Sequence, residues 1–246
     1  PRAEIVESLG NPDDQRKISL IAIHAHGIPE DFPESVLQEC ETLPPPKMDS
    51  RTDLRNVPLL TIDPIDARDH DDAVHAEPDT DPKNSGGFVV TVAIADVAHY
   101  IRPGSKLDRE AQLRGNSVYF PDRVVPMLPE KISNDLCSLR ELEERPCLAV
   151  RMIFDKHGEK RKHTFLRAMM KSAAKLSYQE AQAAIDGKPS DKCQPLMERA
   201  LLPLWAAYRA VAKARDSRGP LDLDLPERKI VLDEQGKVAR VVTPER

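Results

Sequence analysis

The feature that most restricts the fold is an acidic segment that directly follows a short apolar run. Leu59–Ile62 is typical of a buried strand, and five aspartates follow within ten positions: Asp63, Asp66, Asp69, Asp71 and Asp72. Two carboxylates about 4 Å apart repel by roughly 1 kcal/mol in water and about 4 kcal/mol at an effective dielectric near 20. A fold that gathers several of them must therefore supply protons or a cation. The alternative is a solvated acidic turn beside Pro64.

Oxygen ligands alone favour a hard ion, magnesium or manganese ahead of zinc. In an extended chain Asp69 and Asp71 project to one face and Asp72 to the other, while Pro64 bends the chain so that Asp63 can join them. The sequence therefore predicts that this segment can hold one or two hard metal ions.

Two other kinds of metal site use residues of the same segment. A calcium-binding EF-hand is excluded, because Val74 stands where that loop requires glycine. A helical metal phosphohydrolase built on His70 and Asp71 stays open, with further ligands from His24, His26 or His99. It needs helices around His70, which Pro64 and the β-branched run after Gly87 disfavour.

The remaining pattern predicts a sheet with a few helices. Prolines make up 22 of 246 residues, which disfavours a bundle of long helices. Further strands are expected at 88–94, at 148–154 and around Met169, with a hairpin formed by 230–232 and 238–242.

Two helices are expected in the carboxyl-terminal half. Ser177–Gly187 begins with an S-x-x-E capping box and ends at a glycine. Leu196–Arg215 has amphipathic spacing, with a kink expected at Pro203 and with Trp205 and Tyr208 expected in the core.

Charge is segregated along the chain. The 41 acidic residues exceed the 36 lysines and arginines, a balance unusual for a nucleic-acid-binding protein. Residues 156–175, however, hold seven lysines or arginines against Glu159 alone. This tract predicts contacts with backbone phosphates, and its simpler interpretation is a solvated basic face.

Composition limits the cellular setting. No apolar run reaches the eighteen or more residues of a membrane span, so no membrane association is expected. The four cysteines form no CxxC pair, which favours a reducing compartment, and we expect a cytoplasmic protein. Cys137 is expected to be a small buried side chain.

The motif Asp63-x5-Asp69-x-Asp71-Asp72-Ala73 resembles the signature of the ribonuclease II and ribonuclease R family, whose catalytic domain is called RNB. Further segments resemble family blocks in the same order: 51–55, 92–101, 104–108, 117–121, 126–129, 135–139 and 218–227. The similarity runs from Arg51 to the end and is nearer to the ribonuclease R branch. It implies that 51–246 is the amino-terminal part of an RNB domain. Residues 1–50 would then be a linker, with the tail of a cold-shock domain at Pro1–Gly10.

The resemblance implies an α+β fold in which helices flank a mixed sheet and a funnel admits single-stranded RNA. It implies magnesium, or manganese, held by four carboxylates: Asp63, Asp69, Asp71 and Asp72. Asp71 and Asp69 would be catalytic, with Asp71 indispensable, and Tyr119 would stack on the terminal base. The reaction implied is metal-activated 3′ to 5′ hydrolysis of RNA to nucleoside 5′-monophosphates.

The family's catalytic domain continues well beyond Arg246, so the resemblance also implies a fragment. The full-length parent would be an exoribonuclease, while this piece alone could lack turnover. The alternative is a non-catalytic RNA-binding fragment or module of the same fold. Asp96 and His99 are expected to be structural at least as readily as catalytic.

Overall fold

The computed structural model describes residues 17–221, 223, 225–226 and 228–243. The segment Pro1–Gly10, where the tail of a cold-shock domain is expected, lies outside these residues. The chain divides into two compact units. The first comprises Pro1–Thr42, Pro103–Pro129 and Asp222–Arg246, and the second comprises Leu43–Arg102 and Glu130–Leu221.

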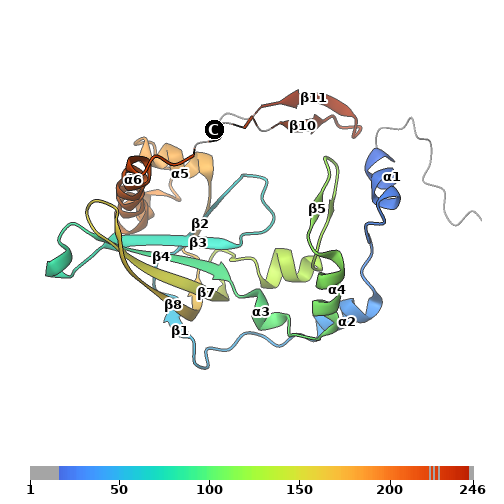
Figure 1. The fold of residues 1–246 in the computed structure, drawn as a ribbon, viewed down its shortest axis with the longest axis horizontal. Helices are drawn as coiled ribbons and strands as arrows, with labels where there is room; N and C mark the ends of the chain where they lie inside the picture. The colour runs from blue at the N-terminus through green and yellow to red at the C-terminus, as the bar shows by residue number, and fades with distance from the viewer. Residues whose placement is uncertain (1–16, 222, 224, 227, 244–246) are drawn as a thin grey trace, which may run out of the picture. The chain divides into compact units, whose positions relative to one another are not determined.

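The second unit is built on a mixed seven-stranded sheet (Figure 1). In spatial order its strands are β1 (Thr52–Leu54), β8 (Lys160–Lys171), β7 (Glu144–Phe154), β4 (Phe88–Ala95), β3 (Asp72–Pro78), β2 (Leu60–Asp63) and β9 (Ala174–Ser177). The outer pairs β1–β8 and β2–β9 are parallel and the inner pairs are antiparallel. Each strand expected in this region is present, and the α+β prediction is confirmed.

Helices complete the second unit. They are η2 (Pro82–Asn84), α3 (Val97–Tyr100), η3 (Lys131–Leu136), α5 (Tyr178–Ile185), η4 (Gln194–Leu196), η5 (Met197–Leu201) and α6 (Leu202–Ser217). Helix α5 starts at the predicted capping box, where Ser177 accepts from the Glu180 amide and the Glu180 carboxylate accepts from the Ser177 amide. This prediction is confirmed.

The expected helix 196–215 was only partly right. It is divided into the 3₁₀ turn η4, the π-helical turn η5 and α6. Pro203 lies in the first turn of α6, where a missing N–H is tolerated, instead of kinking a longer helix. Tyr208 was wrongly placed in the core: it is 55% exposed. Its ring stacks on Trp205, with centroids 5.1 Å apart, so it lies at the edge of the apolar stripe.

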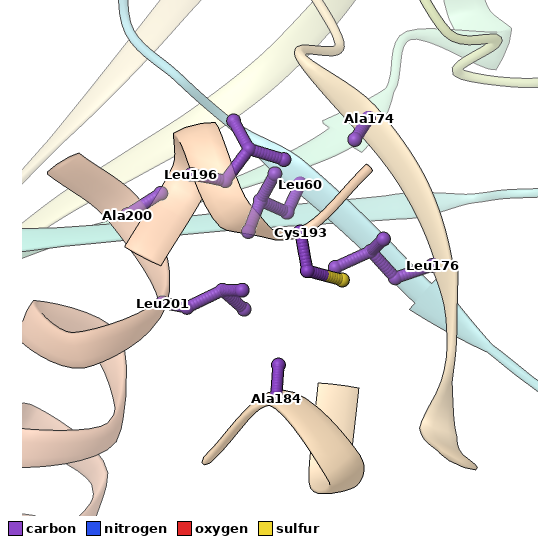
Figure 2. Close-up of a cluster of buried hydrophobic side chains, with 8 residues drawn as sticks. All are labelled: Leu60, Ala174, Leu176, Ala184, Cys193, Leu196, Ala200 and Leu201. Atoms are coloured by element: carbon purple, nitrogen blue, oxygen red, sulfur yellow. The ribbon is translucent and has the colours of Figure 1, made fainter. Parts of the chain in front are cut away.

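A compact apolar cluster fixes the strand that leads into the acidic segment (Figure 2). Leu60 of β2 is fully buried against side chains of β9, α5, η4 and η5. The other buried members are Ala174, Leu176, Ala184, Cys193, Leu196, Ala200 and Leu201. Burial of a leucine side chain stabilises by about 1.5–3 kcal/mol, so this cluster holds β2 and β9 in place.

The turn between β7 and β8 packs against α6. Gly158 has φ +81°, and a Cβ atom there would lie 2.2 Å from the carbonyl oxygen of Ala210. Only glycine combines this conformation with so close an approach.

The first unit contains helices α1 (Ile18–Ala25), α2 (Glu34–Glu41) and α4 (Lys106–Arg114) and two small antiparallel pairs. These pairs are β5 (Val118–Tyr119) with β6 (Val124–Val125) and β10 (Lys229–Leu232) with β11 (Val238–Val242). The late hairpin is therefore confirmed. Arg114 joins several segments by donating to Glu110 at 2.8 Å and to the Pro29 carbonyl at 2.7 Å, and by stacking on Phe32 at 3.7 Å.

Candidate metal and RNA site

The acidic segment spans the junction between two neighbouring antiparallel strands. Asp63 is the last residue of β2 and Asp72 is the first residue of β3. Leu60 pairs with Val74, so the end of β2 lies beside the beginning of β3. Asp69 and Asp71 lie in the connecting loop. The fold thus brings the first and last aspartates of the predicted motif together, where β2 ends and β3 begins.

Backbone hydrogen bonds anchor the second half of this loop. The Leu139 amide donates to the His70 carbonyl at 2.8 Å, and the Ala95 amide donates to the Asp71 carbonyl at 2.9 Å. The buried His70 ring is hydrogen-bonded through Nδ1 to Oδ2 of Asp63 at 2.9 Å. This contact ties the loop to the end of β2 and fixes the orientation of the Asp63 carboxylate.

The carboxylates are close enough to affect one another. Burial raises the pKa of Asp71, and the charges of Asp69, Asp72 and Asp63 raise it further. Burial also raises the pKa of Asp72, with a contribution from Asp63. Negative charge is therefore crowded at this junction, and a bound cation would relieve the repulsion.

The donor set fits a hard divalent ion, because every candidate ligand is a carboxylate oxygen. The structure does not show a formed metal centre, however. Among the residues it describes, no three histidine, cysteine, aspartate or glutamate side chains are grouped so as to hold one ion. Asp63, Asp69 and Asp72 lie close enough to Asp71 to raise its pKa, and the role of the four aspartates as metal ligands stays a prediction.

Tyr119, the predicted base-stacking residue, belongs to strand β5 of the first unit. Its side chain is 72% exposed. The ring is therefore accessible to a ligand, as stacking requires.

An ion-pair cluster at the end of β4 went unrecognised in the sequence. Oδ2 of the buried Asp96 accepts from Arg51 at 2.8 Å and from Arg167 at 3.0 Å. Burial opposes ionisation, but these hydrogen bonds hold the pKa of Asp96 below its usual value. Burial lowers the pKa of the neighbouring His99. The cluster supports the structural interpretation of Asp96.

The phosphohydrolase alternative loses its basis. His70 lies in a loop between two strands, whereas that site needs helices around it. Cys137 is buried as expected, and so are the other three cysteines. No helix in the described part of the chain is long and apolar enough to cross a membrane.

Comparisons with known proteins agree on one family. The family model described as RNB domain matches residues 51–246. Ribonuclease R of Vibrio parahaemolyticus is 40% identical over 244 residues, covering 97% of this chain and 29% of the relative. Ribonuclease R of Escherichia coli is 38% identical over 249 residues, covering 99% and 30%.

A solved structure shows the same fold. Mycoplasma genitalium RNase R in complex with ribose methylated single-stranded RNA superposes with a TM-score of 0.89 at 29% identity. The alignment covers 97% of this chain and 37% of that one. This chain therefore spans about a third of the length of such relatives.

Proposed function

This chain belongs to the RNB domain family, and on that premise we propose that it is part of a hydrolytic exoribonuclease that degrades single-stranded RNA from the 3′ end to nucleoside 5′-monophosphates. The observation that carries the proposal is the group of carboxylates at the β2–β3 junction, where burial and then the charges of Asp69, Asp72 and Asp63 raise the pKa of Asp71. A cytoplasmic location fits four buried cysteines that form no CxxC pair.

Magnesium, or manganese in its place, would be held by the four motif carboxylates: Asp63, Asp69, Asp71 and Asp72. When bound, such an ion polarises the scissile phosphate and lowers the pKa of a coordinated water. Because the described side chains are not grouped as ligands, the proposal requires the 64–71 loop to bring its carboxylates closer together.

The protein's own groups have separate roles in this proposal. His70 orients the Asp63 carboxylate through the 2.9 Å hydrogen bond. Asp71 stands among the charges of Asp69, Asp72 and Asp63, so its carboxylate would be a ligand of the ion that offsets this repulsion. Asp69 would share the charge of the site with Asp71.

The proposal is tested by incubating the full-length parent with magnesium and a single-stranded RNA that carries a label at its 5′ end. Progressive shortening of the labelled strand, with release of mononucleotides, is the expected result. Internal cleavage products, or nucleotide monoester hydrolysis without RNA degradation, would contradict it.

Replacing Tyr119 by alanine is expected to weaken RNA binding by about tenfold, since stacking on an aromatic side chain contributes about 1–3 kcal/mol per base. Fluorescence anisotropy with labelled RNA in EDTA measures this without turnover. Tyr119→Phe should bind like wild type because it keeps the ring. If the Tyr119→Ala variant binds RNA as tightly as wild type, Tyr119 does not stack on a base.

A non-catalytic RNA-binding fragment is the second candidate, and it is favoured by the ungrouped acidic side chains of the described residues. It predicts RNA affinity that is the same with magnesium and with EDTA, and no turnover by the parent. The hydrolase proposal predicts both turnover and a magnesium requirement.

A further inference from the structure

Strand β8 presents cationic and aromatic side chains to solvent. We call the following set the β8 strip: Lys160, Arg161, Lys162, His163, Phe165 and Arg167. All six are exposed, and Phe165 is 66% exposed. His163, Phe165 and Arg167 alternate along the strand and therefore share one face of the sheet. The His163 ring contacts the Phe165 ring edge-on, with centroids 5.4 Å apart.

The strip lies on a rigid, partly open strand. On one side β8 pairs with β7 from Lys160 to Lys171. On its other side β1 pairs only with Ala168–Met170, so in the described part of the chain 160–167 has no second strand neighbour (Figure 1). A ligand that binds here would meet a backbone already fixed by pairing with β7, so the strand need not be ordered on binding.

The charge of the strip is positive although the whole chain carries a net charge of −5. Arg161 donates to Asp155 at 2.6 Å. At the other end, Arg51 and Arg167 share the single carboxylate of Asp96, which leaves that cluster with a net positive charge. Arg161 and Arg167 are 66% and 58% exposed, and each guanidinium has five donors, so both can still contact an anion.

We propose that the β8 strip is a second RNA-binding surface, on which Phe165 stacks on a base while Lys160 and Arg167, which share its face of the sheet, contact the phosphates. The inference rests on the proposed function, because it names where that substrate is held outside the acidic site. Alternate residues of a strand are about 6.8 Å apart, close to one step of an extended nucleotide chain. Cations interleaved with aromatic rings are typical of single-strand binding surfaces.

Neighbouring strands continue this face with aliphatic side chains. Val150 and Leu148 of β7 pair with Phe165 and Arg167, and Leu148 is 47% exposed. A protein segment that packs on this face would contact the same aliphatic side chains. The two occupants differ in what they require at position 165: RNA requires an aromatic ring, and an apolar protein contact accepts an aliphatic one of similar size.

The first test measures binding of labelled single-stranded RNA to variants of the 246-residue chain by fluorescence anisotropy in EDTA. Phe165→Leu is expected to weaken binding about tenfold, and Phe165→Tyr should bind like wild type. Tyr208→Ala removes a similarly exposed ring on α6 and should leave the affinity unchanged. Equal binding by Phe165→Leu and wild type would overturn the proposal in favour of a protein contact.

The second test replaces Lys160, which pairs with Phe154 and shares the face of Phe165, by alanine and measures affinity over a range of salt concentrations. The lost phosphate contact should reduce the slope of log K against log salt by about 0.7. Lys188→Ala removes the same charge away from β8 and should leave the slope unchanged. Equal slopes for the two variants would contradict a phosphate contact by the strip.

These outcomes separate this inference from the proposed function. If wild type binds RNA and the β8 variants bind equally, only the β8 strip is refuted. If the wild-type chain binds no RNA and the full-length parent degrades none, the proposed function is refuted, and the inference about the β8 strip is refuted with it. Circular dichroism melting curves should coincide for wild type and the variants, because the replaced side chains are exposed.

Discussion

Replacing Asp71 by asparagine in the full-length parent is expected to lower the rate of mononucleotide release by roughly a thousandfold, as for the loss of one group that stabilises the transition state electrostatically. The substitution keeps the size of the side chain but removes the negative charge with which it would hold the divalent ion. Burial and three neighbouring carboxylates raise the pKa of Asp71, and such perturbed carboxyl groups are concentrated at functional sites. Single-turnover degradation of labelled RNA at saturating magnesium measures the effect.

Asp66→Asn is the matched control, because it removes the same charge from the same loop but lies outside the family motif. We expect it to keep activity within about threefold of wild type, since its carboxylate has no proposed catalytic role. Undiminished activity of the Asp71 variant, or equal losses in both variants, would remove Asp71 from the mechanism.

Replacing Asp96 by alanine is expected to lower the free energy of unfolding by about 3–5 kcal/mol, because it leaves the buried guanidinium of Arg51 without its carboxylate. Asp96 is 7% exposed and Arg51 is 8% exposed. Urea denaturation of the 246-residue chain measures the change. Arg167 is 58% exposed, so Arg167→Ala should lose only about 0–1 kcal/mol.

The same pair predicts a pH dependence. Arginine hydrogen bonds overcome the effect of burial and lower the pKa of Asp96 below the usual 3.8. Its contribution is therefore complete above that value and is lost as the pH falls through the lower pKa of the folded state. An Asp96→Ala variant as stable as wild type at neutral pH would show that the cluster does not stabilise the fold.

Local patterns in the sequence predicted much of the sheet and one helix correctly. Leu60 and its neighbours form an apolar run that is a strand, and the Ser177–Glu180 pair starts α5 as a capping box. Such signals depend on residues close together in the chain, so they can be recognised without knowledge of the tertiary contacts. Tyr208 was misplaced because helical spacing does not distinguish the centre of an apolar stripe from its exposed edge.

Contacts between distant segments could not be predicted in this way. Arg51, Asp96 and Arg167 meet only because the sheet brings β8 beside the ends of other strands. The Asp63–His70 hydrogen bond depends on the path of the connecting loop. The presence of His70 within the aspartate motif was the one signal for this hydrogen bond, but the sequence does not show which aspartate the ring contacts in the folded loop.

Calorimetric titration of magnesium into the 246-residue chain measures directly whether the acidic segment binds a divalent ion. We expect saturable binding that is lost or strongly weakened in Asp71→Asn and is retained in Asp66→Asn. Absence of magnesium binding in wild type, or equal affinity in wild type and Asp71→Asn, would contradict the claim that the carboxylates at the β2–β3 junction hold a hard divalent ion.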